Sequence, residues 1–123
     1  MPSPFNKRKK GQEAEALACN YLMQKGLKLI EQNYYCRGGE IDLIMEDKGS
    51  VVFIEVRMRN NPNFGSGAES VDWRKQRKLT MAAMHFLQHH PKLAQQPARF
   101  DVIAINRQQN NTDIQWIENA FQA

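Results

Sequence analysis

Cysteine is scarce in this chain, with two among 123 residues. Cys19 and Cys36 are too far apart for a closely spaced metal-binding or redox motif, and too few for a disulfide-stabilised scaffold. We therefore expect free thiols in a reducing cytoplasm. Long apolar runs are missing as well, since none approaches the ~20 residues of a membrane-spanning helix. No apolar stretch follows the basic N-terminus as in a secretory signal, so we expect no membrane association.

Acidic residues are the minority among the charged side chains: 17 lysines and arginines stand against 13 aspartates and glutamates, for a net charge of +4. The cations gather in three places. These are residues 7–10, the pair Arg57 and Arg59, and the group Arg74, Lys75, Arg77 and Lys78. Clustered cations suit a phosphate backbone, with an affinity that falls as salt rises. A solvated tail and a solvated helix face would share this pattern, so charge alone leaves both interpretations open.

The length of the chain suits one hydrophobic core. We expect a flexible basic arm over residues 1–10 and a single domain over residues 11–123. From Gly11 onward, apolar residues recur at helical spacing, and Gly26 is a natural helix end. Glu15 lies on the border of this apolar stripe.

Three β-strands are predicted next, over residues 27–36, 40–46 and 51–58, with a hairpin loop between the last two. Strict alternation in the second strand would group Ile41 with Leu43 on one face. The third strand is apolar on both faces, which predicts a sheet covered by helices on both sides.

The rest of the chain completes an α-β-β-β-α-β order with a C-terminal extension. The expected elements are a loop over residues 60–67, a helix over 71–90 capped by Ser70, a buried strand over 97–105, an edge strand over 114–116 and a terminal helical turn through Phe121. This order predicts an α/β fold.

Two carboxylates lie inside strands that are predicted to be buried. An ionised carboxylate loses hydration on burial and needs a partner. If the two strands pair as a hairpin, Asp42 and Glu55 lie near each other, and hard cations such as Mg²⁺ prefer carboxylate oxygens. Glu15 could add a third carboxylate. Arg57 shares a face with Glu55 and could stabilise charge on a phosphate. The pattern predicts a divalent-metal site that handles phosphate, and buried acids neutralised by neighbouring arginines are the structural alternative.

Other polar residues have competing interpretations. Arg99 and Asp101 point the same way on one strand, where we expect an ion pair bordering the site. His85 and His89 are spaced i, i+4 and could share a metal, but histidines also complement the dipole at a helix C-terminus. Among the aromatic residues, only Phe64 in the glycine-containing loop is placed to stack on a base.

The combined motifs resemble those of the YraN-type family of small uncharacterised bacterial proteins. The resemblance is carried by Gly11-x-x-x-Glu15, Gly39-Glu40-Ile41-Asp42-Leu43-Ile44, Phe53-Ile54-Glu55-Val56-Arg57-x-Arg59, Ser70-Val71-x-x-x-Lys75-x-x-Lys78-Leu79, Arg99-Phe100-Asp101-Val102 and Trp116-Ile117-x-x-Ala120-Phe121. It covers nearly everything after residue 10. That family is similar in turn to the restriction-endonuclease-like PD-(D/E)xK nucleases, and among them to archaeal Holliday-junction resolvases.

The resemblance implies a restriction-endonuclease-like fold with a mixed central sheet flanked by helices. It also implies a site for Mg²⁺ or Mn²⁺ in which Glu15, Asp42 and Glu55 are the catalytic acids. Asp42 and Glu55 would bind the metal, with the backbone carbonyl of Val56 as a further ligand.

One position departs from the nuclease pattern, which has lysine two residues after the second acid. Here that residue is Arg57. Arginine stays protonated and cannot act as a general base, although it can clamp a phosphate. Lys75, at the start of the basic helix, is the candidate to stand in for the lysine.

The leading hypothesis is a Mg²⁺- or Mn²⁺-dependent endonuclease acting on DNA, with branched or otherwise structured DNA among the candidate substrates. The residues expected to grip the backbone are Arg59, Arg74, Lys75, Arg77 and Lys78. The alternatives are a non-catalytic nucleic-acid-binding protein on the same fold, and an interaction protein that uses the loop 60–67. A homodimer would suit a symmetric substrate, but no motif indicates one.

Overall fold

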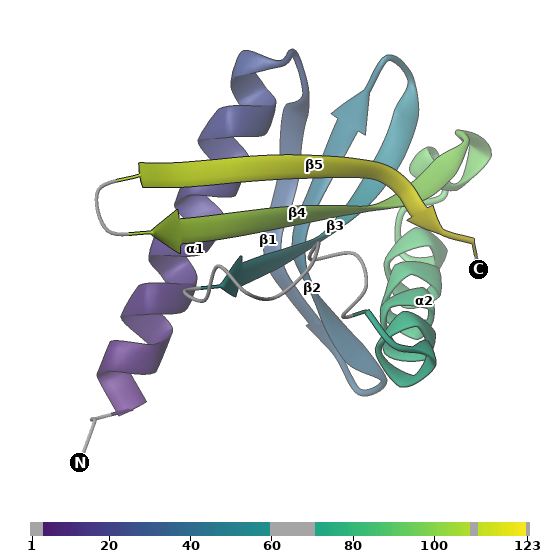
Figure 1. Cartoon of the computed structure of the whole chain (residues 1–123). Helices are drawn as coiled ribbons and strands as arrows, with labels where there is room; N and C mark the ends of the chain where they lie inside the picture. The colour runs from purple at the N-terminus through teal and green to yellow at the C-terminus, as the bar shows by residue number, and fades with distance from the viewer. Residues whose placement is uncertain (1–3, 60–70, 109–110, 123) are drawn as a thin grey trace.

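Helices cover both sides of a central β-sheet (Figure 1). The structure is a computed structural model that describes residues 4–59, 71–108 and 111–122. The elements are, in order, α1 (Pro4–Gln24), β1 (Lys28–Cys36), β2 (Gly39–Asp47), β3 (Ser50–Arg59), α2 (Trp73–Gln88), the short 3₁₀ helix η2 (Leu93–Gln95), β4 (Ala98–Gln108) and β5 (Asn111–Phe121). This order confirms the predicted α/β class. Within the described ranges, no helix combines the length and apolar content needed to cross a membrane.

The sheet contains five strands in the order β1-β2-β3-β4-β5. β3 and β4 are parallel, and every other neighbouring pair is antiparallel. The sheet is therefore mixed. The parallel pair is possible because the long connection that contains α2 returns the chain to the end of the sheet at which β3 begins, so that β4 runs in the same direction.

Two apolar clusters lie on opposite faces of the sheet. The buried residues of the α1-side core are Ala14, Ala18, Cys19, Leu22, Leu27, Leu43, Met45, Val52, Ile54, Ile103 and Ile105. Those of the α2-side core are Ile41, Ile44, Val51, Phe53, Val71, Leu79, Ala82, Ala83, Phe86, Phe100 and Val102. β3 contributes alternate residues to the two cores, as its apolar run predicted. Cys19 and Cys36 are free thiols.

The alternation predicted for β2 is wrong at one end. Leu43 belongs to the α1-side core, whereas Ile41 packs with Ile44 in the α2-side core. The backbone therefore departs from regular alternation between Ile41 and Leu43. The paired register with β3 extends only to the pair Leu43 and Ile54, so the ladder no longer holds β2 beyond that point.

The first helix begins earlier than predicted, since α1 starts at Pro4 and not at Gly11. The helix therefore includes residues 4–10, which the sequence analysis assigned to the basic arm. Lysine and arginine are good helix formers, and proline is tolerated in the first turn, so the basic run can continue a helix. Gly26 ends the helix as predicted: its φ is 99°, and the Leu27 N–H donates to the Leu22 carbonyl at 3.1 Å.

The second helix begins two residues later than predicted. Asp72 caps α2, and its Oδ1 accepts a hydrogen bond of 2.9 Å from the backbone N–H of Lys75. The predicted cap, Ser70, lies outside the described residues. Near this end, α2 packs closely on the start of β2: a Cβ placed on Gly39 would lie 2.7 Å from the Lys78 carbonyl oxygen.

The C-terminal segment is a long strand, so the predicted short edge strand with a helical turn is wrong. β5 pairs with β4 over Asn111–Phe121, with a register irregularity near its end. There Asn119 has a φ of 51°, and its N–H donates to Asp101 Oδ1 at 2.9 Å. This irregularity puts Ile117 and Ala120, three residues apart, against the same core. The i, i+3 spacing of Ile117 and Ala120, which is typical of a helical turn, therefore comes from a bulged strand.

The predicted ion pair between Arg99 and Asp101 is present, with Arg99 Nε at 3.1 Å from Asp101 Oδ1. Arg99 also contacts Asp47 at 2.8 Å and Glu118 at 3.3 Å. Asp101 is almost fully buried and accepts a hydrogen bond of 2.9 Å from Trp116 Nε1. Because Asp47 lies at the β2–β3 hairpin, this network stabilises the hairpin end of the sheet and does not border Asp42 and Glu55.

The contact between Gly39 and Lys78 generates a stability prediction. Gly39→Ala should lower the free energy of unfolding by about 1–3 kcal/mol, because the added methyl group would collide with the backbone of α2. Urea unfolding followed by circular dichroism would measure this change. Gly11→Ala is the matched control: a Cβ there meets nothing within 4 Å, and alanine favours a helix by about 0.5–1 kcal/mol. Equal effects of the two changes would contradict the packing argument.

Candidate active site

Asp42 anchors a site at the point where β2 and β3 cease to pair. The backbone N–H of Val56 donates to Asp42 Oδ2 at 2.8 Å, so the carboxylate takes the place of a backbone acceptor. Burial raises the pKa of Asp42, while the bond from Val56 and the charges of Lys75 and Arg57 oppose that rise. The side chain thus lies alongside β3, close to Glu55.

Glu55 is a buried acid next to two cations. Only 7% of its surface is exposed, and its Oε1 lies 3.4 Å from Lys75 Nζ and 3.7 Å from Arg57 Nε. Burial, with repulsion from Asp42, raises the pKa of Glu55 to about 7, although the two cations pull it down. Both predicted acids therefore meet here. Lys75, the predicted substitute for the missing lysine, reaches the same carboxylate.

Glu15 approaches from α1. Its pKa is raised, first by burial and then by repulsion from Asp42, while a hydrogen bond with the side chain of Asn33 opposes that rise. The Glu15 and Asp42 carboxylates are therefore close enough for the charge of one to raise the pKa of the other. The third predicted acid therefore joins the pair from the sheet.

These residues line a pocket of about 290 Å³, which we call the carboxylate pocket. Its lining consists of Gly11, Ala14, Glu15, Glu40, Asp42, Glu55, Val56, Met58 and Lys75. Both α1 and α2 contribute, although they cover opposite faces of the sheet, because β2 and β3 have separated here. Glu40 was not predicted as a site residue, although its position two residues before Asp42 could have suggested it.

The charges of the pocket suit a cation. Four carboxylates and one lysine line it, and burial raises the pKa of three of the acids. Within residues 4–59, 71–108 and 111–122, no three histidine, cysteine, aspartate or glutamate side chains are arranged to enclose a metal ion. Mg²⁺, however, commonly binds one or two protein carboxylates and keeps several waters. The donor set of Asp42, Glu55 and the Val56 carbonyl fits such an ion.

The predicted basic surface occupies the start of α2. Arg74, Arg77 and Lys78 are exposed there, and the Arg74 guanidinium lies 5.5 Å from the ring centre of Trp73. Lys75, in contrast, turns toward the carboxylate pocket. The side chain of Arg59 lies outside the described part of the chain.

Other predicted candidates lie elsewhere. The Nδ1 of His89 pairs with the carbonyl of His85, and His85 Nδ1 contacts the hydroxyl of Tyr34. Neither histidine lines the carboxylate pocket. Phe64 lies outside the described residues.

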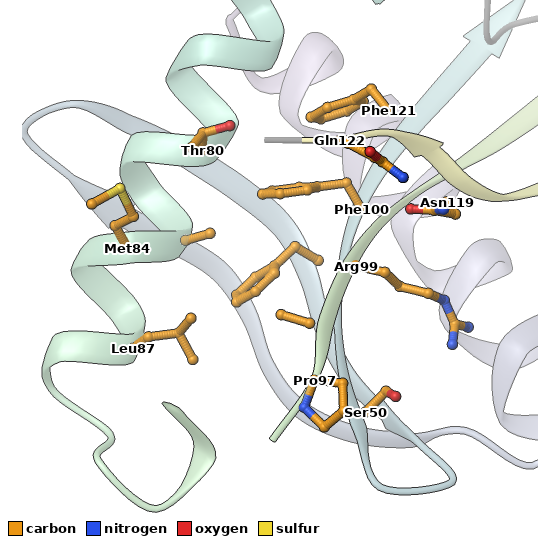
Figure 2. A pocket seen from close by; sticks show the side chains of 13 residues that line it. Ser50, Thr80, Met84, Leu87, Pro97, Arg99, Phe100, Asn119, Phe121 and Gln122 are labelled. Atoms are coloured by element: carbon orange, nitrogen blue, oxygen red, sulfur yellow. The ribbon is translucent and has the colours of Figure 1, made fainter. Parts of the chain in front are cut away.

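A larger pocket, of about 680 Å³, lies between α2 and the sheet (Figure 2). Met84 and Leu87 reach it from α2, and Phe100 and Phe121 from the strands, while the guanidinium of Arg99 points away (Figure 2). Its lining is mostly apolar and, among the residues that the structure describes, contains no carboxylate. The predicted acids therefore meet in the smaller carboxylate pocket and not in this one.

The raised pKa of Glu55 predicts a pH-dependent stability. The folded state holds this proton up to about pH 7 and the unfolded state up to about pH 4.5, so the stabilisation by protonation is complete below 4.5 and is lost as the pH rises through 7. Glu55→Gln imitates the protonated acid. At pH 8, without divalent metal, its free energy of unfolding should exceed that of the wild type by roughly 2–3 kcal/mol. At pH 4 the two free energies of unfolding should be equal.

Urea unfolding at both pH values would measure this difference. Glu13→Gln, on the exposed surface of α1, is the control and should follow the wild type at both values. A Glu55→Gln protein that gains no stability at pH 8 would show that the charge of Glu55 is well solvated.

Relatives of this chain carry no assigned activity in their names. Residues 14–105 match the profile described as uncharacterised protein family UPF0102. A UPF0102 protein of Nitrosococcus oceani is 48% identical over 118 residues, which cover 96% of this chain and 95% of the relative. The UPF0102 protein of Pseudomonas syringae pv. syringae is 52% identical over 112 residues, covering 90% and 91%, and that of Alcanivorax borkumensis is 43% identical over 122 residues, covering 98% of each. The YraN-type resemblance is thereby confirmed, and the chain belongs to the UPF0102 family.

Proposed function

We propose that this protein is a metal-dependent endonuclease that acts on DNA and uses the carboxylate pocket as its active site. One observation carries the proposal: Asp42 and Glu55 meet in a pocket of four carboxylates, with Lys75 beside them and an exposed basic surface on the same helix. The acids suit a divalent cation, and the basic surface suits a phosphate backbone. In this proposal the α/β fold is of the restriction-endonuclease-like type, with Mg²⁺ or Mn²⁺ as the cofactor and the cytoplasm as the setting.

Each residue of the pocket has a distinct role in the proposal. Asp42, Glu55 and the Val56 carbonyl hold the metal, which supplies a water of lowered pKa and neutralises charge on the phosphate. The bond from the Val56 N–H fixes the Asp42 carboxylate in its orientation. Glu15 stands on the opposite side of the pocket from α2, where it can accept a proton from an attacking water.

The two cations beside Glu55 divide the task of binding phosphate. Arg57 remains charged at any working pH, so it stabilises negative charge and takes no part in proton transfer. Lys75 lies in the first turn of α2, where the helix dipole adds to its attraction for anions. Lys75 can therefore hold the phosphate from the side opposite the sheet.

The second candidate is a nucleic-acid-binding protein without catalysis. It is favoured by one observation, that arginine occupies the position of the nuclease lysine, two residues after Glu55. The basic surface of α2 would then be the functional feature, and the buried acids would be structural.

A cleavage assay on linear, flapped and four-way-junction DNA tests the enzyme proposal. Cleavage should require Mg²⁺ or Mn²⁺. Asp42→Asn and Glu55→Gln should each lower it by more than the roughly 10–100-fold that loss of an outer-shell partner costs. Asp113→Asn, on the exposed part of β5, is the control and should cut normally. If neither metal elicits cleavage by the wild type, and calorimetry detects no metal binding, the enzyme proposal fails.

Substitutions on one helix separate catalysis from binding. Lys75→Ala should lower kcat more than it changes affinity, because Lys75 lies against Glu55. Arg77→Ala, on the exposed side of the same helix, should weaken DNA binding and reduce the salt dependence of affinity by about one unit of slope, with little effect on kcat. Affinity measured by fluorescence anisotropy and single-turnover rates distinguish these effects. Equal losses of kcat would contradict the assignment of Lys75 to the active site.

A further inference from the structure

A second hollow continues the carboxylate pocket toward β1. It has a volume of about 330 Å³ and is lined by Gly11, Gln12, Glu15, Asn33, Tyr35 and Glu40. Three of these residues, Gly11, Glu15 and Glu40, also line the carboxylate pocket. The two hollows therefore adjoin each other at Glu15, and we call the second one the β1 groove.

The chemistry of the β1 groove differs from that of the carboxylate pocket. Its lining offers the side-chain amides of Gln12 and Asn33 and the ring of Tyr35, with no lysine or arginine among the residues whose side chains the structure describes. Glu15 and Glu40 make it unfavourable for a phosphate. Amides and carboxylates do suit the hydrogen-bonding edge of a nucleobase, and an aromatic ring suits its face.

Local geometry directs these side chains to one place. Tyr35 is 70% exposed and pairs across the sheet with Glu40. Gln12 and Glu15 lie one turn apart on α1 and so share a face. Asn33 has a φ of 53° within β1, and its side chain bonds with Glu15, which leaves other amide hydrogen-bonding positions available. The groove thus has a stacking surface and polar groups for a base edge.

We propose that the β1 groove binds one unpaired nucleobase next to the phosphate held in the carboxylate pocket. Tyr35 stacks on the face of the base, while Gln12, Asn33 and Glu40 bond with its edge. A base inside a duplex has its faces covered by its neighbours, whereas a flap or gap supplies an unpaired base without the few kcal/mol that unstacking costs. This proposal rests on the proposed function and defines its substrate class as DNA with unpaired bases beside a duplex.

A binding experiment with 2-aminopurine, a fluorescent base that is quenched by stacking, tests the proposal. The probe is placed at the first unpaired position of a flapped duplex, and Ca²⁺ replaces Mg²⁺ so that binding is measured without cleavage. The wild type should quench the probe. Tyr35→Ala should abolish quenching and weaken flap binding by about 5–150-fold, which corresponds to the 1–3 kcal/mol of one stacked base. Tyr35→Phe should retain both.

Controls separate this proposal from the proposed function. Tyr35→Ala should leave affinity for a fully paired duplex unchanged, and Met84→Ala, an exposed residue at the apolar pocket, should bind both probes normally. If the wild type cleaves DNA with metal but Tyr35→Ala changes neither quenching nor flap affinity, the base site is overturned and the proposed nuclease function is retained. Quenching that depends on Tyr35 without cleavage under Mg²⁺ or Mn²⁺ would support the base site alone. A wild type that binds neither probe would overturn the base site.

Discussion

The hydrogen bond from the Val56 N–H to the Asp42 carboxylate is the interaction on which the arrangement of the site depends. The backbone ladder between β2 and β3 is paired to Leu43 and Ile54 and does not continue. At the next position the carboxylate accepts the N–H that a backbone carbonyl would otherwise take. β2 is then able to leave β3, and Ile41 turns to the α2-side core. The opening is reached from both faces of the sheet, which is why α1 can supply Glu15 and α2 can supply Lys75 to one pocket.

The electrostatics of this opening are the physical basis for the metal in the proposed function. Removing a carboxylate from water disfavours its charged form, and a second carboxylate nearby disfavours it further. Both effects act on Glu15 and Glu55 and raise the pKa of each, that of Glu15 despite its hydrogen bond with Asn33 and that of Glu55 despite the charges of Lys75 and Arg57. One lysine among four lining carboxylates does not balance their charge. Among the described residues, the larger apolar pocket beside α2 has no comparable imbalance of charge, so its size does not make it the better candidate for the proposed site.

Sequence patterns predicted those parts of the fold that depend on burial. β3 is apolar on both faces, and its two sets of side chains do enter two cores. The prediction failed where a polar group replaces a regular ladder, as at Ile41 and at the bulge near Asn119, because alternation assumes an uninterrupted strand. The sequence motifs predicted Asp42, Glu55 and Lys75 as site residues. They favoured Phe64 over Tyr35 as the aromatic residue for a nucleobase, because the mostly exposed β1 carries no pattern that relates its side chains to α1.

The position of Lys75 connects the packing of α2 with the proposed chemistry. A lysine on β3 would be held by the sheet itself, but Arg57 has that position and cannot give up its proton. The only other cation that contacts Glu55 among the described residues comes from the first turn of α2. Two features hold that turn: the cap by Asp72, and the close approach of Lys78 to the Cβ-free Gly39. Glu55 therefore sits between an arginine on the sheet and a lysine on the helix, and the position of the lysine depends on how closely α2 docks on β2.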